Sequence, residues 1–143
     1  MEVAEISRMA TRAVITWFGL LVLAFANAAL REGWLMPRLG ERPSHAISSG
    51  TLAIAILLAG WYATRWVHPE SPSQAWAVGA IWLGLTLAFE FLAGHFLFGR
   101  SWATLMADYN LLAGRLWILV LVTTLTTPIL AFIWRTASVT RHS

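Results

Sequence analysis

Glu90 is a single carboxylate within the apolar run Trp76 to Phe98, which is long enough to cross a lipid bilayer. An acid at the centre of a membrane costs roughly 2.5–3.5 kcal/mol on the insertion scale. Such side chains usually face a bundle interior or a water-filled cavity, where they pair with other groups or move protons. We therefore expect the chemistry of this protein to lie around Glu90.

Three hypotheses account for a carboxylate at this position. Arg31, Arg100 or Arg115 reaches inward and holds it in an ion pair, which gives it a structural role. Alternatively, it is a protonated acid in a proton relay, or it faces a partner helix in an oligomer. His95 follows five residues later, about 140° round an α-helix, so the two side chains are not expected to share a metal ion.

Polar side chains from all four expected spans gather in the same half of the membrane as Glu90. At about 1.5 Å per helical residue, His95 lies about 6 Å and Glu90 about 13 Å below the surface at Gly99. Charged residues lie at the membrane surface above them. The candidates for ligand binding or proton transfer are Glu90, His95, Arg31, Glu32, Arg38, His45, Arg100, Asp108, Arg115, Asn27, Thr123 and Thr124.

The other half of the membrane is almost free of polar side chains. The second span has none from Leu52 to Gly60, and the fourth has none from Pro128 to Trp134; Thr16 and Thr86 are the exceptions on the other two spans. A continuous pore would need polar lining on both sides of the midplane. The pattern predicts instead an arginine-rich cup with an apolar floor.

His45 and His95 suggest a second kind of site. Two histidines at similar depth on adjacent spans could ligate a b-type haem in a four-helix bundle. His45 lies at the edge of the membrane beside Pro43, where an interfacial role is also expected. We therefore predict no cofactor and no metal, and keep b-type haem as an alternative. No spacing of serine, histidine and acid indicates nucleophilic catalysis, so an enzyme is not favoured.

The composition is that of a membrane protein. Hydrophobic residues make up 58% of the 143 residues and charged residues 12%, against about 25% charged in a soluble domain. The absence of cysteine excludes disulfides and thiolate metal sites. All ten basic residues are arginine, which suits recognition of anions or lipid headgroups, although genomic base composition would have the same effect. No aromatic-interleaved basic stripe indicates nucleic-acid binding.

The elements that must position Glu90 are four membrane-spanning helices in one domain, residues 1–143. A spanning helix needs about 20 mostly apolar residues. Prolines 37 and 43 mark the first connection, and Pro128 predicts a kink in the fourth helix. We predict an all-α integral membrane protein, a compact bundle with spans at about 13–30, 46–66, 75–98 and 114–134, and an amphipathic helical segment at about 101–113 before the last span.

The ends of the chain leave the orientation open. Arg8 and Arg12 before the first apolar run resemble a signal peptide, but three more spans follow, so an uncleaved first helix is expected. An even number of spans puts both termini on one side. Arginines divide five against five between the two sides, so their count does not decide the orientation. We expect cytoplasmic termini in a bacterial inner membrane.

A transport or ligand-binding protein is the leading functional hypothesis. Its cup, open to the side opposite the termini, would take a small anionic or zwitterionic solute or a lipid headgroup, with Glu90 at the base. The alternatives are an accessory or assembly subunit of a larger membrane complex, and a membrane enzyme or b-type haem or quinone protein. The expected partners are the lipid bilayer and either further copies of the chain or a larger complex.

Overall fold

The computed structural model describes residues 3–97, 99–107 and 117–141 of the chain. Every regular element in these ranges is a helix. Four helical rods are long and apolar enough to cross a membrane: Val3–Leu39, Glu41–Val67, Pro72–Leu97 and Ile118–Thr140. The prediction of an all-α membrane protein with four spans is confirmed.

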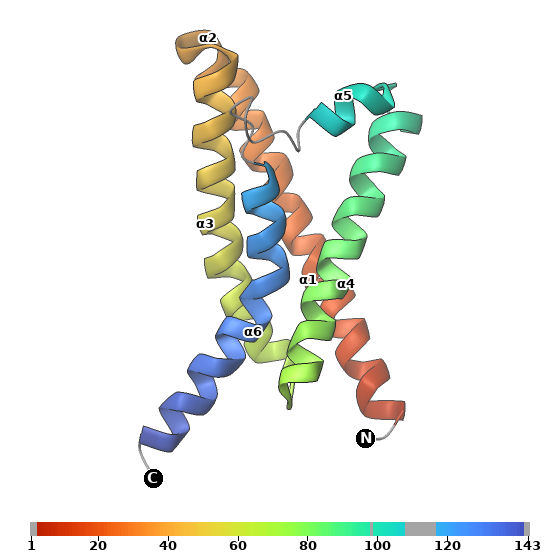
Figure 1. Cartoon of the computed structure of the whole chain (residues 1–143), viewed down its shortest axis with the longest axis vertical. Coiled ribbons are helices and arrows are strands. Elements are labelled where there is room, and N and C mark those ends of the chain that lie inside the picture. The colour runs from red at the N-terminus through yellow and green to blue at the C-terminus, as the bar shows by residue number, and fades with distance from the viewer. Residues whose placement is uncertain (1–2, 98, 108–116, 142–143) are drawn as a thin grey trace.

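The rods pack as a ring (Figure 1). α1 packs against α3 and α4, and α6 also packs against α3 and α4. Both termini lie at one end of the molecule, and α2 and α5 lie at the other (Figure 1). The elements are α1 (Val3–Leu30), the π-helix η1 (Arg31–Leu35), α2 (Met36–Leu39), α3 (Glu41–Val67), α4 (Pro72–Ala88), the π-helix η2 (Phe89–Leu97), α5 (Trp102–Ala107) and α6 (Trp117–Arg141).

The first connection is much shorter than the prolines suggested. Pro43 lies in the first turn of α3, where its missing N–H has no helical acceptor, and Pro37 lies near the start of α2, directly after the π-helix η1. Gly40 alone separates the two helices, with a φ of 82° that favours glycine. α3 therefore begins at Glu41 and not at about residue 46, which brings His45 into a helix.

The turn between α3 and α4 is fixed by hydrogen bonds at the end of the molecule that carries the termini. His68 adopts a left-handed conformation, and its N–H donates to the Thr64 carbonyl over 2.8 Å, which ends α3. The hydroxyl of Ser71 caps α4 by accepting from the Gln74 N–H over 3.1 Å. Arg135 of α6 donates to the Pro69 carbonyl, and Arg12 of α1 donates to the Trp66 carbonyl over 2.8 Å. These two arginines therefore have structural partners.

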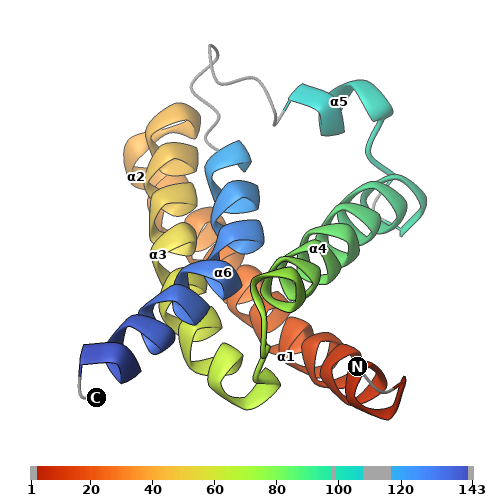
Figure 2. The same cartoon turned by 60° about the horizontal axis from the view of Figure 1, so that its bottom comes forward.

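α6 approaches α4 most closely at a glycine. A Cβ atom on Gly79 would lie 2.0 Å from the carbonyl oxygen of Leu125, so only glycine fits this crossing. α6 contains Pro128 and changes direction along its length (Figures 1 and 2), as the proline predicted. The last turns of α6 extend away from the other rods (Figure 2). At the opposite end, η2 diverges from α1, and the candidate site lies between them.

Candidate functional site

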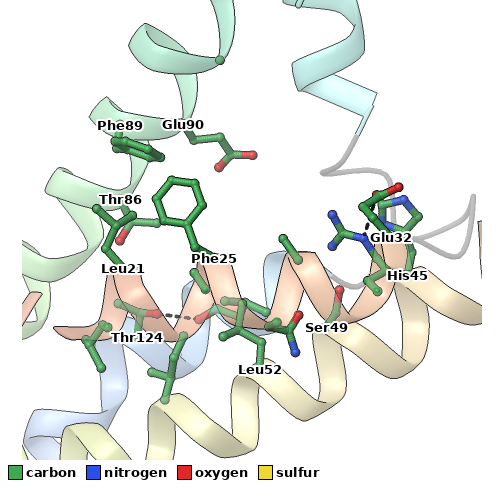
Figure 3. A pocket seen from close by; sticks show the side chains of 18 of the residues that line it. Leu21, Phe25, Glu32, His45, Ser49, Leu52, Thr86, Phe89, Glu90 and Thr124 are labelled. Carbon is green, nitrogen blue, oxygen red and sulfur yellow. Dashed lines mark hydrogen bonds and ion pairs between the residues drawn. The ribbon is translucent and has the colours of Figure 1, made fainter. Parts of the chain in front are cut away.

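A cavity of about 640 Å³ opens between the rods (Figure 3). Each of the four rods contributes to its lining, as do Arg100 and Thr104 near the start of α5. This volume falls within the ~300–1,000 Å³ typical of ligand pockets. The other lining residues are Trp17, Leu20, Leu21, Ala24, Phe25, Asn27, Ala28, Arg31, Glu32, Met36, Glu41, His45, Ser49, Leu52, Ile56, Thr86, Phe89, Glu90, Gly94, Val120 and Thr124.

Two helical stripes form neighbouring parts of the cavity wall. Spacing of three or four residues keeps side chains on one face of a helix, and both stripes follow this spacing. Each stripe changes from apolar side chains to polar side chains toward the end that carries α2 and α5. The stripes are Trp17, Leu20, Ala24, Asn27 and Arg31 on the first rod, and Ile56, Leu52, Ser49, His45 and Glu41 on α3.

Glu90 points into this cavity. Its side chain projects from η2 into the space above Phe25, while Glu32 and His45 lie together at the far end (Figure 3). The hypothesis in which Glu90 faces a partner helix therefore does not fit the direction of its side chain. Glu90 shares the cavity with Arg31 and Arg100, the arrangement that the ion-pair and proton-relay hypotheses both need.

π-Helical segments carry three of the five charged side chains in the described lining of the cavity. η1 supplies Arg31 and Glu32, and η2 supplies Glu90. π-Helices are rare, usually limited to a single turn, and often occur at functional sites. The nine residues of η2 make it unusually long. In a π-helix, residues five apart are hydrogen-bonded neighbours on successive turns, so the α-helical angle assumed between Glu90 and His95 was wrong.

His95 nevertheless lies outside the cavity lining. Its ring stacks on Trp102 with centroids 3.9 Å apart, and its Nδ1 donates to the carbonyl of Arg100 over 2.8 Å. The N–H of Arg100 donates in turn to the Gly94 carbonyl over 2.9 Å. His95 therefore closes the turn that follows η2 and places Arg100 at the cavity.

This arrangement does not support the haem hypothesis, which needs His45 and His95 as a pair of ligands. His45 lines the cavity, whereas the imidazole of His95 is engaged by Trp102 and by a backbone carbonyl. The structure does not present the two rings to one space. Among residues 3–97, 99–107 and 117–141, no group of three histidine, cysteine or acidic side chains is placed to hold a metal ion.

Arg31 is fixed by a small network at the polar end. Its Nε lies 3.3 Å from a carboxylate oxygen of Glu32, and its Nη1 donates to the Ser48 hydroxyl over 3.5 Å. That hydroxyl donates to the Oδ1 of Asn27. The Arg31 side chain is 18% exposed, so its guanidinium is held in a defined orientation beside the cavity. Ser48 and Asn27 thus position the guanidinium group of Arg31.

The apolar end of the cavity is closed by α1 and α4. The indole Nε1 of Trp17 donates to the Thr86 hydroxyl over 3.0 Å. One turn earlier, the Nε1 of the fully buried Trp82 donates to the Ala13 carbonyl over 2.9 Å. We expected Thr86 to be an isolated polar group in the apolar half of the membrane. Thr86 lines the cavity, and its hydroxyl accepts a hydrogen bond from Trp17 at the cavity floor.

Three of the twelve predicted site residues lie outside the cavity lining, and two more are not among the described residues. The Arg38 guanidinium lies 4.8 Å from the centre of the Trp34 ring and donates to the Trp34 carbonyl. Thr123 donates to the Leu119 carbonyl on its own helix. His95 forms the turn, and Asp108 and Arg115 lie outside the described residues. Those in the lining are Asn27, Arg31, Glu32, His45, Glu90, Arg100 and Thr124.

The charge of the lining differs from the arginine-rich cup that we expected. Two guanidinium groups, on Arg31 and Arg100, share the described lining with three carboxyl groups, on Glu32, Glu41 and Glu90. Side chains of both signs therefore face the same space. This mixture suits a ligand that carries a positive and a negative group better than it suits a simple anion.

Sequence reasoning left several lining residues out of the candidate set. Glu41 was missed because α3 was expected to begin at about residue 46, although it shares a helical face with His45 and Ser49. Phe25 and Phe89 were missed because they resemble lipid-facing side chains. Their rings meet edge to face, with centroids 5.8 Å apart, and only the structure shows that this contact adjoins the cavity.

The chain matches no protein-family model, no curated protein and no solved structure.

Proposed function

We propose that this membrane protein binds a zwitterionic ligand in the cavity beside Glu90. The observation that supports this proposal is the mixed lining, in which guanidinium and carboxyl groups converge above an apolar wall. A guanidinium binds phosphate or carboxylate through two parallel hydrogen bonds. A carboxylate on the opposite wall can accept hydrogen bonds from an ammonium group of the same ligand.

Arg100 and Arg31 would bind the anionic group of the ligand. Arg31 is already oriented by Glu32 and Ser48, which reduces the entropy lost on binding. Arg100 is exposed and follows the turn that His95 holds in place. Glu41 on α3 and Glu90 on η2 line the same cavity, and their carboxyl groups would bind the cationic group of the ligand.

Native mass spectrometry of the full chain, released directly from its membrane into lipid nanodiscs, tests this proposal. Wild-type protein should retain a bound zwitterion, and Arg100→Gln should lose it. Arg38→Gln is the matched control, because Arg38 also lies at this end of the molecule but packs on Trp34 outside the cavity. A wild-type particle without a bound molecule, or equal retention by both variants, would overturn the proposal.

Transport across the membrane is a second candidate function. The bend in α6 at Pro128 and the π-helical turns of η2 are features at which helices change shape. The hydrogen bond between Trp17 and Thr86 closes the floor in this structure, so transport requires that contact to open. Flux of a zwitterion into proteoliposomes, accelerated by Thr86→Val, would support transport, and no flux in either protein would exclude it.

A further inference from the structure

We propose that the ligand is an amine-bearing zwitterionic phospholipid, which enters the cavity sideways from the bilayer between α1 and η2. This inference rests on the proposed function and names the class of ligand. Three observations support it: the apolar half of the cavity, the weak packing of η2 against the rest of the bundle, and the arrangement of charges along the membrane normal.

A water-soluble zwitterion would make few contacts with the apolar half of the cavity. Beyond the charged groups, the cavity wall is formed by aliphatic and aromatic side chains from all four rods. A small solute would leave this surface in contact with water, whereas a hydrocarbon chain would cover it. The apolar lining residues are Trp17, Leu20, Leu21, Phe25, Leu52, Ile56, Phe89 and Val120.

The wall between α1 and η2 is loosely packed in the described part of the chain. Within the described part of the chain, η2 packs extensively only on α4, which it continues, and on α5. It meets α1 through Phe89, whose ring contacts Phe25 with centroids 5.8 Å apart and Trp17 with centroids 6.2 Å apart. Above that pair the two walls present the small residues Ala28 and Gly94 to the cavity. Figure 1 shows α4 and η2 diverging from α1 toward this end of the molecule.

Phe25 and Phe89 are placed where a lipid chain would pass. The Phe25 side chain is 50% exposed, so one edge of the ring pair is accessible from the bilayer while the same rings line the cavity. The centroid separation of 5.8 Å and interplanar angle of 88° describe an edge-to-face contact, which is worth about 0.5–1.5 kcal/mol beyond area burial. A contact of this strength can open at room temperature.

The order of charged and apolar groups matches a phospholipid in its normal orientation in a leaflet. Arg31, Arg100 and Glu41 lie at the end of the cavity that carries α2 and α5, where a phosphate and an ammonium group would sit near the membrane surface. The apolar wall lies deeper, where the acyl chain would point toward the midplane. The lipid therefore needs no reorientation to move from the bilayer into the cavity.

Lipid titration of the delipidated full chain in detergent tests this inference by native mass spectrometry. The probes are phosphatidylethanolamine, phosphatidylglycerol with the same acyl chains, and glycerophosphoethanolamine, which has the same headgroup without chains. Phosphatidylethanolamine should bind about tenfold more tightly than either of the others, which corresponds to ~1.4 kcal/mol. If phosphatidylglycerol binds equally well, the cavity attracts anionic headgroups or any phospholipid. That result would overturn the choice of headgroup.

Substitutions on α1 test the position of the acyl chain. Ala24→Leu adds three carbon atoms to a side chain in the apolar wall and should weaken phosphatidylethanolamine binding about tenfold. Ala26→Leu, on the exposed side of the same helix, should leave it unchanged. If thermal unfolding shows that Ala24→Leu does not fold, Ala28→Leu in the lining and the exposed Ala29→Leu form the replacement pair. Equal affinity of the lining and exposed variants would overturn the inference.

The failure of this inference is distinguishable from the failure of the proposed function. If glycerophosphoethanolamine binds as tightly as the lipid and Arg100→Gln abolishes binding, the cavity takes a soluble zwitterion and the lipid inference is wrong. If no probe binds and the particle released from its membrane carries no zwitterion, both proposals are wrong.

Discussion

The indole of Trp17 on α1 donates a hydrogen bond to the hydroxyl of Thr86 on α4 over 3.0 Å, directly beneath the cavity. Trp17 is 7% exposed, so removal of this acceptor would leave a largely buried indole without its hydrogen-bond partner. The pair therefore closes the floor and joins the two helices that diverge above it. Its loss should affect both the stability of the bundle and the closure of the cavity.

Thr86→Val keeps the shape of the side chain but removes the acceptor. We expect it to lower the free energy of unfolding by about 1–3 kcal/mol, because a buried donor is left without a partner. Reversible unfolding of the full chain in detergent measures the change. Thr126→Val is the control, because its hydroxyl donates only to the Val122 carbonyl of its own helix. Equal stability of the two variants would contradict the assigned role of Thr86.

Gly79→Ala tests the crossing of α4 and α6. The new methyl group would lie 2.0 Å from the Leu125 carbonyl oxygen, so the helices must move apart at a cost of about 1–3 kcal/mol. Gly84→Ala on the same helix meets nothing within 4 Å and should be neutral or stabilising, since alanine has the higher helix propensity. Thermal unfolding distinguishes the two, and an unaffected Gly79→Ala protein would show that α4 and α6 do not cross as closely as described.

The orientation in the membrane is open to a direct test because the chain contains no cysteine. We propose that the termini face the cytoplasm. In intact cells, a membrane-impermeant thiol reagent should then label Arg42→Cys, in the exposed first turn of α3, and should not label Glu5→Cys in α1 until the membrane is permeabilised. The reverse pattern would place the cavity on the cytoplasmic side.

The four spans could be predicted from the sequence, since long apolar segments separated by charged residues leave little choice in a bilayer. Their ends could not. Pro37 and Pro43 suggested a loop, but Pro43 fits the first turn of α3 and Pro37 lies within the continuous helical rod Val3–Leu39, so helical structure continues to Gly40 on both sides. The shift of the start of α3 to Glu41 is what places His45 and Glu41 on the face that lines the cavity.

The clustering of polar residues was also predictable in outline, because Asn27, Arg31 and Glu90 all fall in one half of the membrane. The direction of individual side chains was not predictable. The π-helical turns of η1 and η2 have no signature in the sequence, and they change which residues share a face. His95 shows the effect most clearly, since it packs on Trp102 and fixes a turn where a ligand-binding role was expected.

The central claim is that Glu90 lies in a cavity that opens to the side opposite the termini. Reaction of Glu90→Cys with a charged, water-soluble thiol reagent in oriented vesicles tests it directly, with Leu92→Cys, which is 56% exposed on the same π-helix, as the control. The account predicts that the reagent, added to the side opposite the termini, modifies Glu90→Cys and leaves Leu92→Cys unmodified. A Glu90→Cys protein that reacts only after the vesicles are dissolved in detergent would contradict it.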